Sequence, residues 1–252
     1  SQIDGVDAIV ITSYQGVNLQ VTSGNITVVN AVSGAILSTT NAWTAQCEVT
    51  WIMKLSQSVG GLYCRNTQTL QLVDITKSTL PVLTSTMVPN LVMVQNLVSI
   101  PPAVMIEDYD IGCMAALSSG SMFCINVDKT DTNMFGQIVL SFTCTDLTGT
   151  VSMYYHSSLQ LLILVCSDAA ATSTQNQIVA YDVVSWNVTW QLSGIGLLAN
   201  APSFSQLNFG AYYNTSGYFN FLSLQTGAAV LPPYFNSSLC PYGFVAMSVG
   251  EI

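Results

Sequence analysis

The residues of this chain that are suited to covalent chemistry are seven cysteines and a single histidine, His156. The cysteines stand at positions 47, 64, 113, 124, 144, 166 and 240, with no CxxC pair among them. Tetrahedral zinc sites need closely spaced Cys or His ligands, so this spacing argues against zinc. Disulfides are the better interpretation, and seven buried thiols in a reducing compartment are the alternative.

We expect three disulfides, which join Cys47 to Cys64, Cys113 to Cys124, and Cys144 to Cys166. The partners are separated by 17, 11 and 22 residues and fall on successive strand-like segments, where cross-strand pairing brings two sulfur atoms within bonding distance. Cys240 is left over, either buried as a small apolar residue or paired with another chain. Disulfides persist in oxidising compartments, so the pattern favours an extracellular or cell-surface location.

His156 can serve in principle as a general base or as the partner of a reactive thiol. No nucleophile signature accompanies it, because the Gly-x-Ser-x-Gly elbow is absent. The Gly60-Gly61 pair is interpreted as a hairpin turn, since neither a Gly-x-Gly-x-x-Gly motif nor a P-loop is present. We therefore predict no catalytic residue, no cofactor and no enzymatic activity.

Carboxylates gather at two places, Glu107-Asp108-Tyr109-Asp110 and the pair Asp128 and Asp131. Such oxygens are ligands for calcium, but neither group has the regularly spaced, Gly-containing loop of strong calcium motifs. Solvated turns explain both groups, and we predict no metal site.

Four Asn-x-Ser/Thr sequons, at Asn25, Asn187, Asn214 and Asn236, offer N-linked glycosylation. Three of them lie between residues 183 and 250, a stretch without a charged residue. A solvated surface so poor in charge needs another source of hydration, and we predict that N-glycans supply it. Asn214 and Asn236 lie in turn-like sequence, whereas Asn25 and Asn187 begin strands and qualify only if they face outward.

Charge and hydrophobicity argue against two possibilities, nucleic-acid binding and a membrane-spanning helix. Lys and Arg number 4 against 13 Asp and Glu, a net charge of -9, so the basic face that nucleic-acid binding requires is missing. A membrane-spanning helix needs about 20 mainly apolar residues, and the most apolar long run, residues 91–106, is interrupted by the Pro101-Pro102 pair. The chain begins with Ser1, as expected of a processed protein or an excised fragment.

Turn-rich, β-branched and aromatic segments recur throughout, and they predict an all-β chain. Among the expected strands are Ala8–Thr12, Val17–Val21 and Phe244–Ser248. Short, closely spaced strands are typical of a sandwich, a barrel or a propeller.

A recurring phrase decides among these architectures. It consists of an apolar strand, a small or acidic polar residue, a turn with Ser, Thr or Gly, and another strand. The polar residue of its five copies is Asn30, Asp74, Asn126, Asp182 and Ser223, at steps of 44, 52, 56 and 41 residues. Propeller blades recur at roughly 40 to 50 residues. We therefore predict one β-propeller domain over residues 1–252, with five or six blades; a β-sandwich is the alternative.

In this interpretation each copy is the outer hairpin of a blade, in which the polar residue caps the turn and Gly or Ser accepts its unusual dihedral angles. The strand-like ends Ala8–Thr12 and Phe244–Ser248 are expected to share one blade and so to close the ring.

The phrase resembles the repeat of the quinoprotein-alcohol-dehydrogenase-like β-propellers, which reads as a strand, Ala-x-Asp, a turn ending in Thr-Gly, and a strand ending in Trp. Ala180-Tyr181-Asp182 followed by Trp190 is similar to it, and Ser33-Gly34 and Thr226-Gly227 match its turn. For enzymes of that family the resemblance implies a pyrroloquinoline quinone site with adjacent cysteines, a calcium ion and a catalytic acid. This chain has no adjacent cysteines and no matching acid cluster, so the resemblance implies the fold without the chemistry.

We expect a secreted structural or assembly subunit that self-associates into an extracellular filament, appendage or surface coat. Few charges mean little long-range repulsion between copies, and a polar, aromatic surface suits permanent contacts. Candidate contact elements are Leu231–Phe235, Gly243–Ile252 and the N-terminal strand. An extracellular glycan- or ligand-binding module, with clusters such as Tyr212-Tyr213 around a channel, is the alternative, and a quinoprotein-type enzyme is the third hypothesis.

Overall fold

The computed structural model describes residues 2–17, 20–41, 44, 47, 49–64, 66–88, 103–115, 121–143, 150–167, 176–195, 203–204, 208–213, 218–230 and 234–235. The chain divides into two compact units, residues 1–142 and 143–252, which are described one at a time. Strands dominate the described residues, with one short 3-10 helix, η1 (Glu107–Tyr109). The all-β prediction is confirmed, and the prediction of a single domain stays a prediction.

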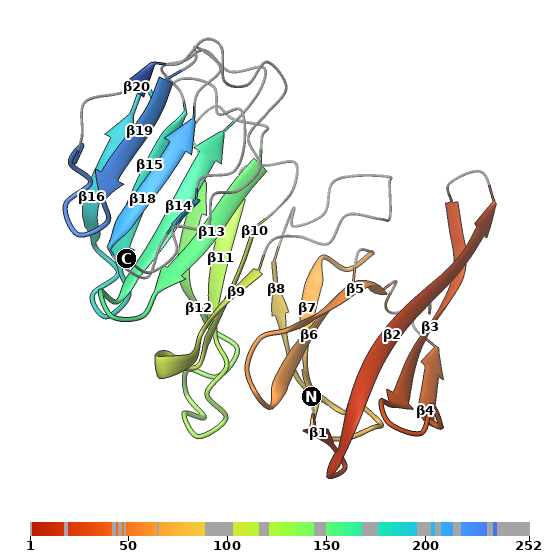
Figure 1. The fold of residues 1–252 in the computed structure, drawn as a ribbon. Coiled ribbons are helices and arrows are strands. Elements are labelled where there is room, and N and C mark those ends of the chain that lie inside the picture. The colour runs from red at the N-terminus through yellow and green to blue at the C-terminus, as the bar shows by residue number, and fades with distance from the viewer. Residues whose placement is uncertain are drawn as a thin grey trace. The chain divides into compact units, whose positions relative to one another are not determined.

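Unit 1 contains three four-stranded sheets, each built from strands that follow one another in the chain (Figure 1). The first sheet contains β1 (Gln2–Ile3), β2 (Val6–Val17), β3 (Gln20–Asn30) and β4 (Ile36–Asn41). The second contains β5 (Val49–Lys54), β6 (Val59–Cys64), β7 (Thr69–Asp74) and β8 (Val82–Met87). The third contains β9 (Ala103–Ile106), β10 (Ile111–Ala115), β11 (Ser121–Asn126) and β12 (Ile138–Thr143).

Unit 2 contains two more sheets with the same topology. The fourth sheet contains β13 (Thr150–His156), β14 (Leu161–Ser167), β15 (Gln177–Asp182) and β16 (Val188–Ser193). The fifth contains β17 (Ser203–Phe204), β18 (Phe209–Tyr213), β19 (Tyr218–Ser223) and β20 (Tyr234–Phe235). Five sheets therefore correspond to the five copies of the recurring phrase.

Position within a sheet decides how a strand is buried. The second strands β6 and β10 are buried along their whole length, as expected of central strands covered on both faces. The fourth strands β4 and β8 lie at the sheet edge and are mostly exposed. Their sequences are accordingly rich in Ser and Thr rather than in regularly spaced apolar residues.

Neighbouring sheets within a unit share their hydrophobic cores. One cluster in unit 1 combines Val28 of β3 with Leu62 of β6 and joins the first sheet to the second. Another combines Leu70 of β7 with Ile125 of β11 and joins the second sheet to the third. A third cluster joins the two sheets of unit 2. Face-to-face packing of antiparallel sheets is thus the main source of stability in each unit.

The recurring phrase forms the hairpin between the third and fourth strands, as predicted. Its polar residue ends the third strand and donates its backbone N–H across the turn, over 2.8–3.0 Å, to the carbonyls of Ala35, Pro81, Gln137, Asn187 and Ala228. The residue before each acceptor is left-handed: Gly34, Leu80, Gly136, Trp186 and Gly227, with φ between 46° and 79°. The closing hydrogen bond and the left-handed residue thus recur in all five sheets, although the donor and acceptor are five residues apart in three hairpins, seven in the second sheet and eleven in the third.

Two local predictions are wrong. Val17–Val21 is not one strand, because β2 ends at Val17 and β3 begins at Gln20. Gly60 and Gly61 do not form a turn but lie inside β6, where a Cβ on Gly60 would come within 2.5 Å of the Ile75 side chain. Glycine is needed there for close packing rather than for a bend.

The first sheet takes all four of its strands from residues 2–41. The strand expected at Phe244–Ser248, which was to share a sheet with Ala8–Thr12, lies outside the described residues.

Candidate functional site

Two of the predicted disulfides are confirmed. Cys113 and Cys124 lie directly opposite each other on β10 and β11, and their bond crosses the ladder with a Cα–Cα distance of 4.0 Å. Both side chains are fully buried. The bond therefore links two central strands from inside the core of unit 1.

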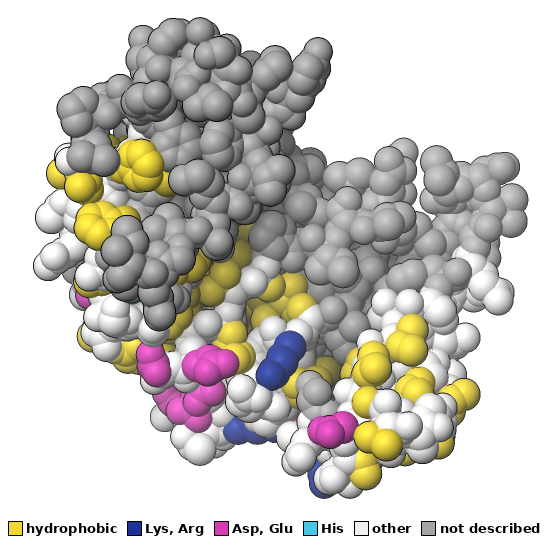
Figure 2. All heavy atoms as spheres, in the orientation of Figure 1, with side chains coloured by type: hydrophobic (Ala, Val, Ile, Leu, Met, Phe, Trp, Pro, Cys, Tyr) yellow, Lys and Arg dark blue, Asp and Glu magenta, His cyan; other side chains and the backbone are white. Residues whose placement is uncertain are grey.

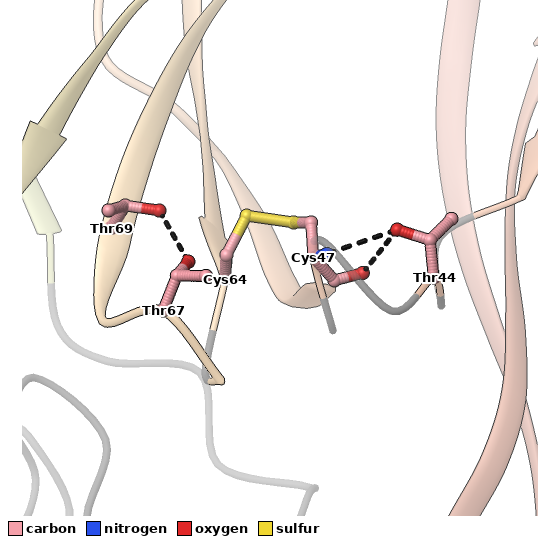
Figure 3. Close-up of a disulfide and its surroundings, with 5 residues drawn as sticks. All are labelled: Thr44, Cys47, Cys64, Thr67 and Thr69. Carbon is pink, nitrogen blue, oxygen red and sulfur yellow. Dashed lines mark hydrogen bonds between the residues drawn. A yellow bond between two sulfur atoms is a disulfide. The ribbon is translucent and has the colours of Figure 1, made fainter.

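The Cys47–Cys64 disulfide joins the segment before β5 to the end of β6, with a Cα–Cα distance of 4.8 Å (Figure 3). The Thr44 hydroxyl is linked to the backbone of Cys47, since its Oγ1 accepts from the Cys47 N–H at 3.0 Å. The disulfide therefore holds the segment that enters the second sheet from the first against the end of β6.

The third predicted disulfide is tested only in part. Cys166 is disulfide-bonded and fully buried, whereas Cys144 lies outside the described residues. The pair Cys144–Cys166 therefore stays a prediction, and so does the fate of Cys240.

His156 ends β13 with a fully buried imidazole. Its Nδ1 accepts a hydrogen bond of 3.3 Å from the Leu159 N–H, so the proton of the neutral ring is on Nε2, for which the described residues supply no partner. The ring packs edge-on against Tyr154, with 6.3 Å between centroids. The imidazole is therefore enclosed by the protein at the end of β13.

The two acidic groups lie in turns. Glu107 and Asp108 lie in the 3-10 helix η1, and the Asp128 carboxylate accepts from the hydroxyl and the backbone N–H of Thr130 at 2.7 and 2.8 Å. These bonds hold the pKa of Asp128 below its usual value. Burial, helped by the nearby Asp128 charge, raises the pKa of Asp110. Within the described residues no cluster of three or more His, Cys, Asp or Glu is placed to hold a metal ion.

In four of the five copies of the recurring phrase the side chain of the polar residue caps the turn, as the sequence predicts: Asn30, Asp74, Asn126 and Asp182. The Asn30 side-chain oxygen accepts from the backbone N–H groups of Val32 and Ser33, at 2.9 and 2.8 Å. Asp182 accepts in the same way from the Ser185 N–H at 2.7 Å and from its hydroxyl at 2.7 Å. These bonds keep the pKa of Asp182 below its usual value. Asp182 is thus a structural cap.

Two of the four sequons lie in the described residues, and both face outward, as glycosylation requires. Asn25 lies on β3 and Asn187 just before β16, and both side chains are exposed. Asn214 and Asn236 lie outside the described residues. The sequence suggests that Tyr212 lines a binding channel, but in the structure Tyr212 packs against the core of unit 2.

Exposed apolar side chains form the most unusual surface of the described residues. Of fourteen exposed large hydrophobic residues, eleven lie on fourth strands or on the hairpins that lead into them: Val32, Ile36, Leu37, Val82, Leu83, Met87, Met134, Ile138, Val184, Val188 and Val230. Figure 2 shows hydrophobic side chains gathered over β2–β4, at the lower right. Strands β4, β8, β12 and β16 contain no charged residue.

Trp190 connects the two sheets of unit 2. Its indole Nε1–H donates to the carbonyl of Leu224 at 2.7 Å, and its ring lies against Gly227, where a Cβ would come within 2.7 Å of a ring carbon. The Trp of one repeat therefore packs on the Gly of the Thr-Gly turn of the next repeat. Sequence alone marked both positions but gave no indication that they touch.

Comparison with known proteins finds the fold but no family. No family model matches the chain, and no curated protein matches it. BamB from Moraxella catarrhalis is similar in structure, with a TM-score of 0.53 and 13% identity over 91% of this chain and 62% of that chain. A chain in the crystal structure of the mitotic checkpoint complex has a TM-score of 0.52 and 14% identity, over 91% of this chain and 60% of that chain.

Both of these neighbours are β-propellers. The chain has a β-propeller fold. The β-sandwich alternative is therefore rejected. The chain spans less than two thirds of the length of either neighbour. The described residues include no helix long and apolar enough to cross a membrane.

Proposed function

We propose that this β-propeller is a secreted, disulfide-bonded structural subunit that self-associates into an extracellular filament, appendage or surface coat. The observation that carries the proposal is the apolar, uncharged character of its exposed sheet edges. Edge strands present unpaired backbone groups, and natural proteins usually protect them with lysine, proline or a covering segment. Val82 and Met87 of β8 are instead 53% and 68% exposed on a strand without a charged residue.

The small number of charged residues also supports self-association. A chain with only 4 Lys and Arg and 13 Asp and Glu has few ionic groups that must lose their hydration when two copies meet. Removing charged side chains from water is one of the costs of forming a permanent interface, and the cores of such interfaces are accordingly poor in charged residues. Hydroxyl and amide side chains pair across such an interface at a smaller cost.

Disulfides and sequons support an extracellular location. The Cys47–Cys64 and Cys113–Cys124 bonds belong to a chemistry that persists in oxidising compartments. The exposed sequon at Asn187 is suitable for an N-glycan.

A relationship to the quinoprotein-alcohol-dehydrogenase-like propellers is part of the proposal. It is supported by the contact of Trp190 with Gly227, since both residues belong to the motif that carries the resemblance. We propose that the chain has kept the fold without the enzymatic activity. His156 is enclosed in the core, and Asp128 and Asp182 are engaged in capping turns.

The test is the size of the purified protein in solution. Size-exclusion chromatography with light scattering, over a concentration series under non-reducing conditions, is expected to give particles larger than the 27.0 kDa chain, and negative-stain microscopy is expected to show a regular assembly. A 27.0 kDa species that persists at millimolar concentration contradicts the proposal.

A further inference from the structure

Strand β8 is the outer edge of a sheet whose two faces are covered inside unit 1. Val73, on one face, belongs to the cluster shared with the first sheet, and Leu72, on the other face, belongs to the cluster shared with the third. β8 pairs with β7 and is the last strand in the order of its sheet. Its protective features, Pro81 and the bulge opposite Leu72 and Val73, lie at its beginning. The rest of the edge of β8 is therefore where this sheet can accept a further strand.

The outward backbone groups of β8 belong to alternate residues. Val88, which follows the strand, donates its N–H to the carbonyl of Gln68 at 2.9 Å. Bonded and non-bonded pairs alternate along an antiparallel ladder, so Thr86 also bonds to β7, whereas Ser85 and Met87 direct their N–H and C=O groups away from it. Nothing in the part of the chain that the structure describes bonds to these outward groups.

The third sheet holds this edge in position. The Thr86 hydroxyl donates to the carbonyl of Gly136, and a Cβ on Gly136 would come within 2.8 Å of the Thr84 side chain. Thr84 and Thr86 therefore pack on the hairpin of the third sheet, while Ser85, between them, points to the opposite face. An edge that is already held in place loses little conformational freedom when it pairs, and this favours binding.

The sequence of β8 is self-complementary about Ser85. Two antiparallel copies of the strand, aligned on this residue, place Thr84 opposite Thr86 and Leu83 opposite Met87 of the other copy. Leu83, Ser85 and Met87 share one face by alternation, and all three are exposed, Leu83 by 40% and Met87 by 68%. Thr–Thr pairs across an antiparallel ladder are stabilising, and the contact of Leu83 with Met87 removes apolar surface from water. β8 contains no charged residue, so no like charges meet within the paired strands.

Other registers fit less well. Ser85 directs both its N–H and its C=O outward, so two copies aligned on it exchange two hydrogen bonds. Alignment on Thr84 places Met87 opposite Pro81, which has no N–H to donate. Alignment on Thr86 leaves the beginning of each strand unpaired. The register centred on Ser85 is therefore the one that best satisfies both backbone and side chains.

We propose that β8 pairs edge to edge with β8 of a second copy of this chain, antiparallel and centred on Ser85, so that two four-stranded sheets join into one. The match of the strand to itself selects a second copy as the occupant. This inference rests on the proposed self-association and names its first contact. A contact made by the same surface of both copies is isologous and closes as a dimer with two-fold symmetry. A filament or a surface coat then needs a second contact between such dimers.

Opposite charges at position 85 test the symmetry. Ser85→Lys and Ser85→Glu each bring two like charges together at the centre of the contact, so each alone is expected to weaken dimer formation at least about tenfold. Mixed in equal amounts, they are expected to form a mixed dimer, because lysine then faces glutamate. Ser157→Lys and Ser157→Glu are the matched controls, since Ser157 is exposed just after β13, away from the fourth strands and their hairpins. Both controls are expected to associate like the wild type in analytical ultracentrifugation.

Cysteine cross-linking tests the register with a much smaller change. Ser85→Cys replaces only the hydroxyl oxygen by sulfur. Residues in a hydrogen-bonded antiparallel pair have Cα atoms about 5.5 Å apart, within the range that a disulfide bridges. Mild oxidation is expected to give a covalent dimer whose bond, mapped by peptide mass spectrometry, joins residue 85 of both copies. Ser157→Cys is expected to give no bond between the two residues 157.

The outcomes separate the two proposals. A wild type that never associates contradicts the proposed function, and this contact with it. A wild type that assembles, with Ser85→Lys and Ser85→Glu that assemble equally well, overturns this inference alone. Weakened variants that do not recover in the mixture also overturn it, because a position that faces itself must accept opposite charges.

A Ser85→Cys protein without a bond between the two residues 85 overturns the inference as well, and this is the result expected if β8 pairs instead with a different protein. If circular dichroism shows that a charged variant fails to fold, the cross-linking result decides.

Discussion

At the scale of single residues, position 227 requires glycine for two separate reasons, its backbone conformation and its contact with Trp190. Gly227 is left-handed, with φ +69°, and a Cβ on it would come within 2.7 Å of the indole. Replacing it by alanine is expected to cost about 1 kcal/mol for the backbone conformation and a further 1–3 kcal/mol for displaced packing. Urea unfolding under non-reducing conditions measures the loss.

Gly194 is the matched control for this prediction. It lies in the same unit with φ +71°, and nothing stands within 4 Å of the position of its Cβ. Gly194→Ala is therefore expected to lose only the conformational part, about 1 kcal/mol. Equal losses in both variants would show that the indole contact contributes nothing.

Asp182 makes the stability of its hairpin depend on pH. The Ser185 N–H and hydroxyl bind its carboxylate and lower its pKa in the folded chain below the ordinary 3.8. The folded state therefore holds the proton less tightly than the unfolded state, so the contribution is complete above pH 3.8 and is lost as the pH falls through the folded pKa.

Asp182→Asn keeps the accepting oxygen but removes the titration. The variant is expected to be slightly less stable at pH 7 and to lose less stability than the wild type between pH 5 and pH 2, in thermal unfolding followed by circular dichroism. Asn30 and Asn126 occupy the equivalent position in two other hairpins, so the amide is compatible with the turn. An unchanged acid limb in Asp182→Asn would contradict the capping role.

Within the sheets, the left-handed position of the hairpin gives a pair of opposite predictions. Gly occupies it in three hairpins, whereas Leu80 and Trp186 occupy it in the other two with φ +46° and +56°. Trp186 is half-buried, so Trp186→Gly is expected to relieve backbone strain and to stabilise the chain by about 0.5–1 kcal/mol.

Leu80→Gly is expected to have the opposite sign. Leu80 is 6% exposed and belongs to the core shared by the first two sheets, so the loss of its side chain costs about 2–4 kcal/mol, more than the relieved strain. Urea midpoints of the two variants test both signs. Stabilisation by both substitutions would show that backbone strain outweighs core packing at this turn.

These elements also show what sequence reasoning can and cannot reach. The five hairpins were predictable because a polar cap and a turn residue are local requirements that the chain must meet with particular residue types. The bounds of strands β4 and β8 were not predictable, because an exposed edge strand has no buried face to impose apolar alternation. The position of Gly60 within β6 depends on how closely Ile75 approaches, which no local pattern records.

For the whole molecule, the repeat in the sequence predicted the propeller fold, and the spacing of the cysteines predicted the two disulfides that are confirmed. The sequence did not indicate which apolar residues are left uncovered. The run at Ala8–Ile11 predicts a strand covered on both faces, and only the structure shows that Ile9 remains half exposed. Burial is a property of neighbouring sheets, and it is absent from the run itself.

Net charge gives the last prediction, which concerns the assembly as a whole. Each copy carries -9 at pH 7, so like charges oppose association, and salt screens this repulsion beyond about 10 Å at 0.1 M. If the contact is apolar, raising the salt from about 0.02 to 0.5 M is expected to strengthen self-association a few-fold, measured by analytical ultracentrifugation. Association that weakens with salt would instead require ion pairs across the interface.

The variant Val82→Lys/Met87→Lys, on the exposed edge strand β8, separates apolar contact from net charge. It reduces the charge of each copy from -9 to -7, so repulsion alone would make it associate more tightly than the wild type. Burying a lysine ammonium in an apolar sheet contact costs far more than the repulsion it relieves. The variant is therefore expected to associate more weakly at every salt concentration above pH 5, where the capping carboxylates stay ionised. Tighter association of this variant would show that charge, rather than the apolar edge of β8, limits assembly.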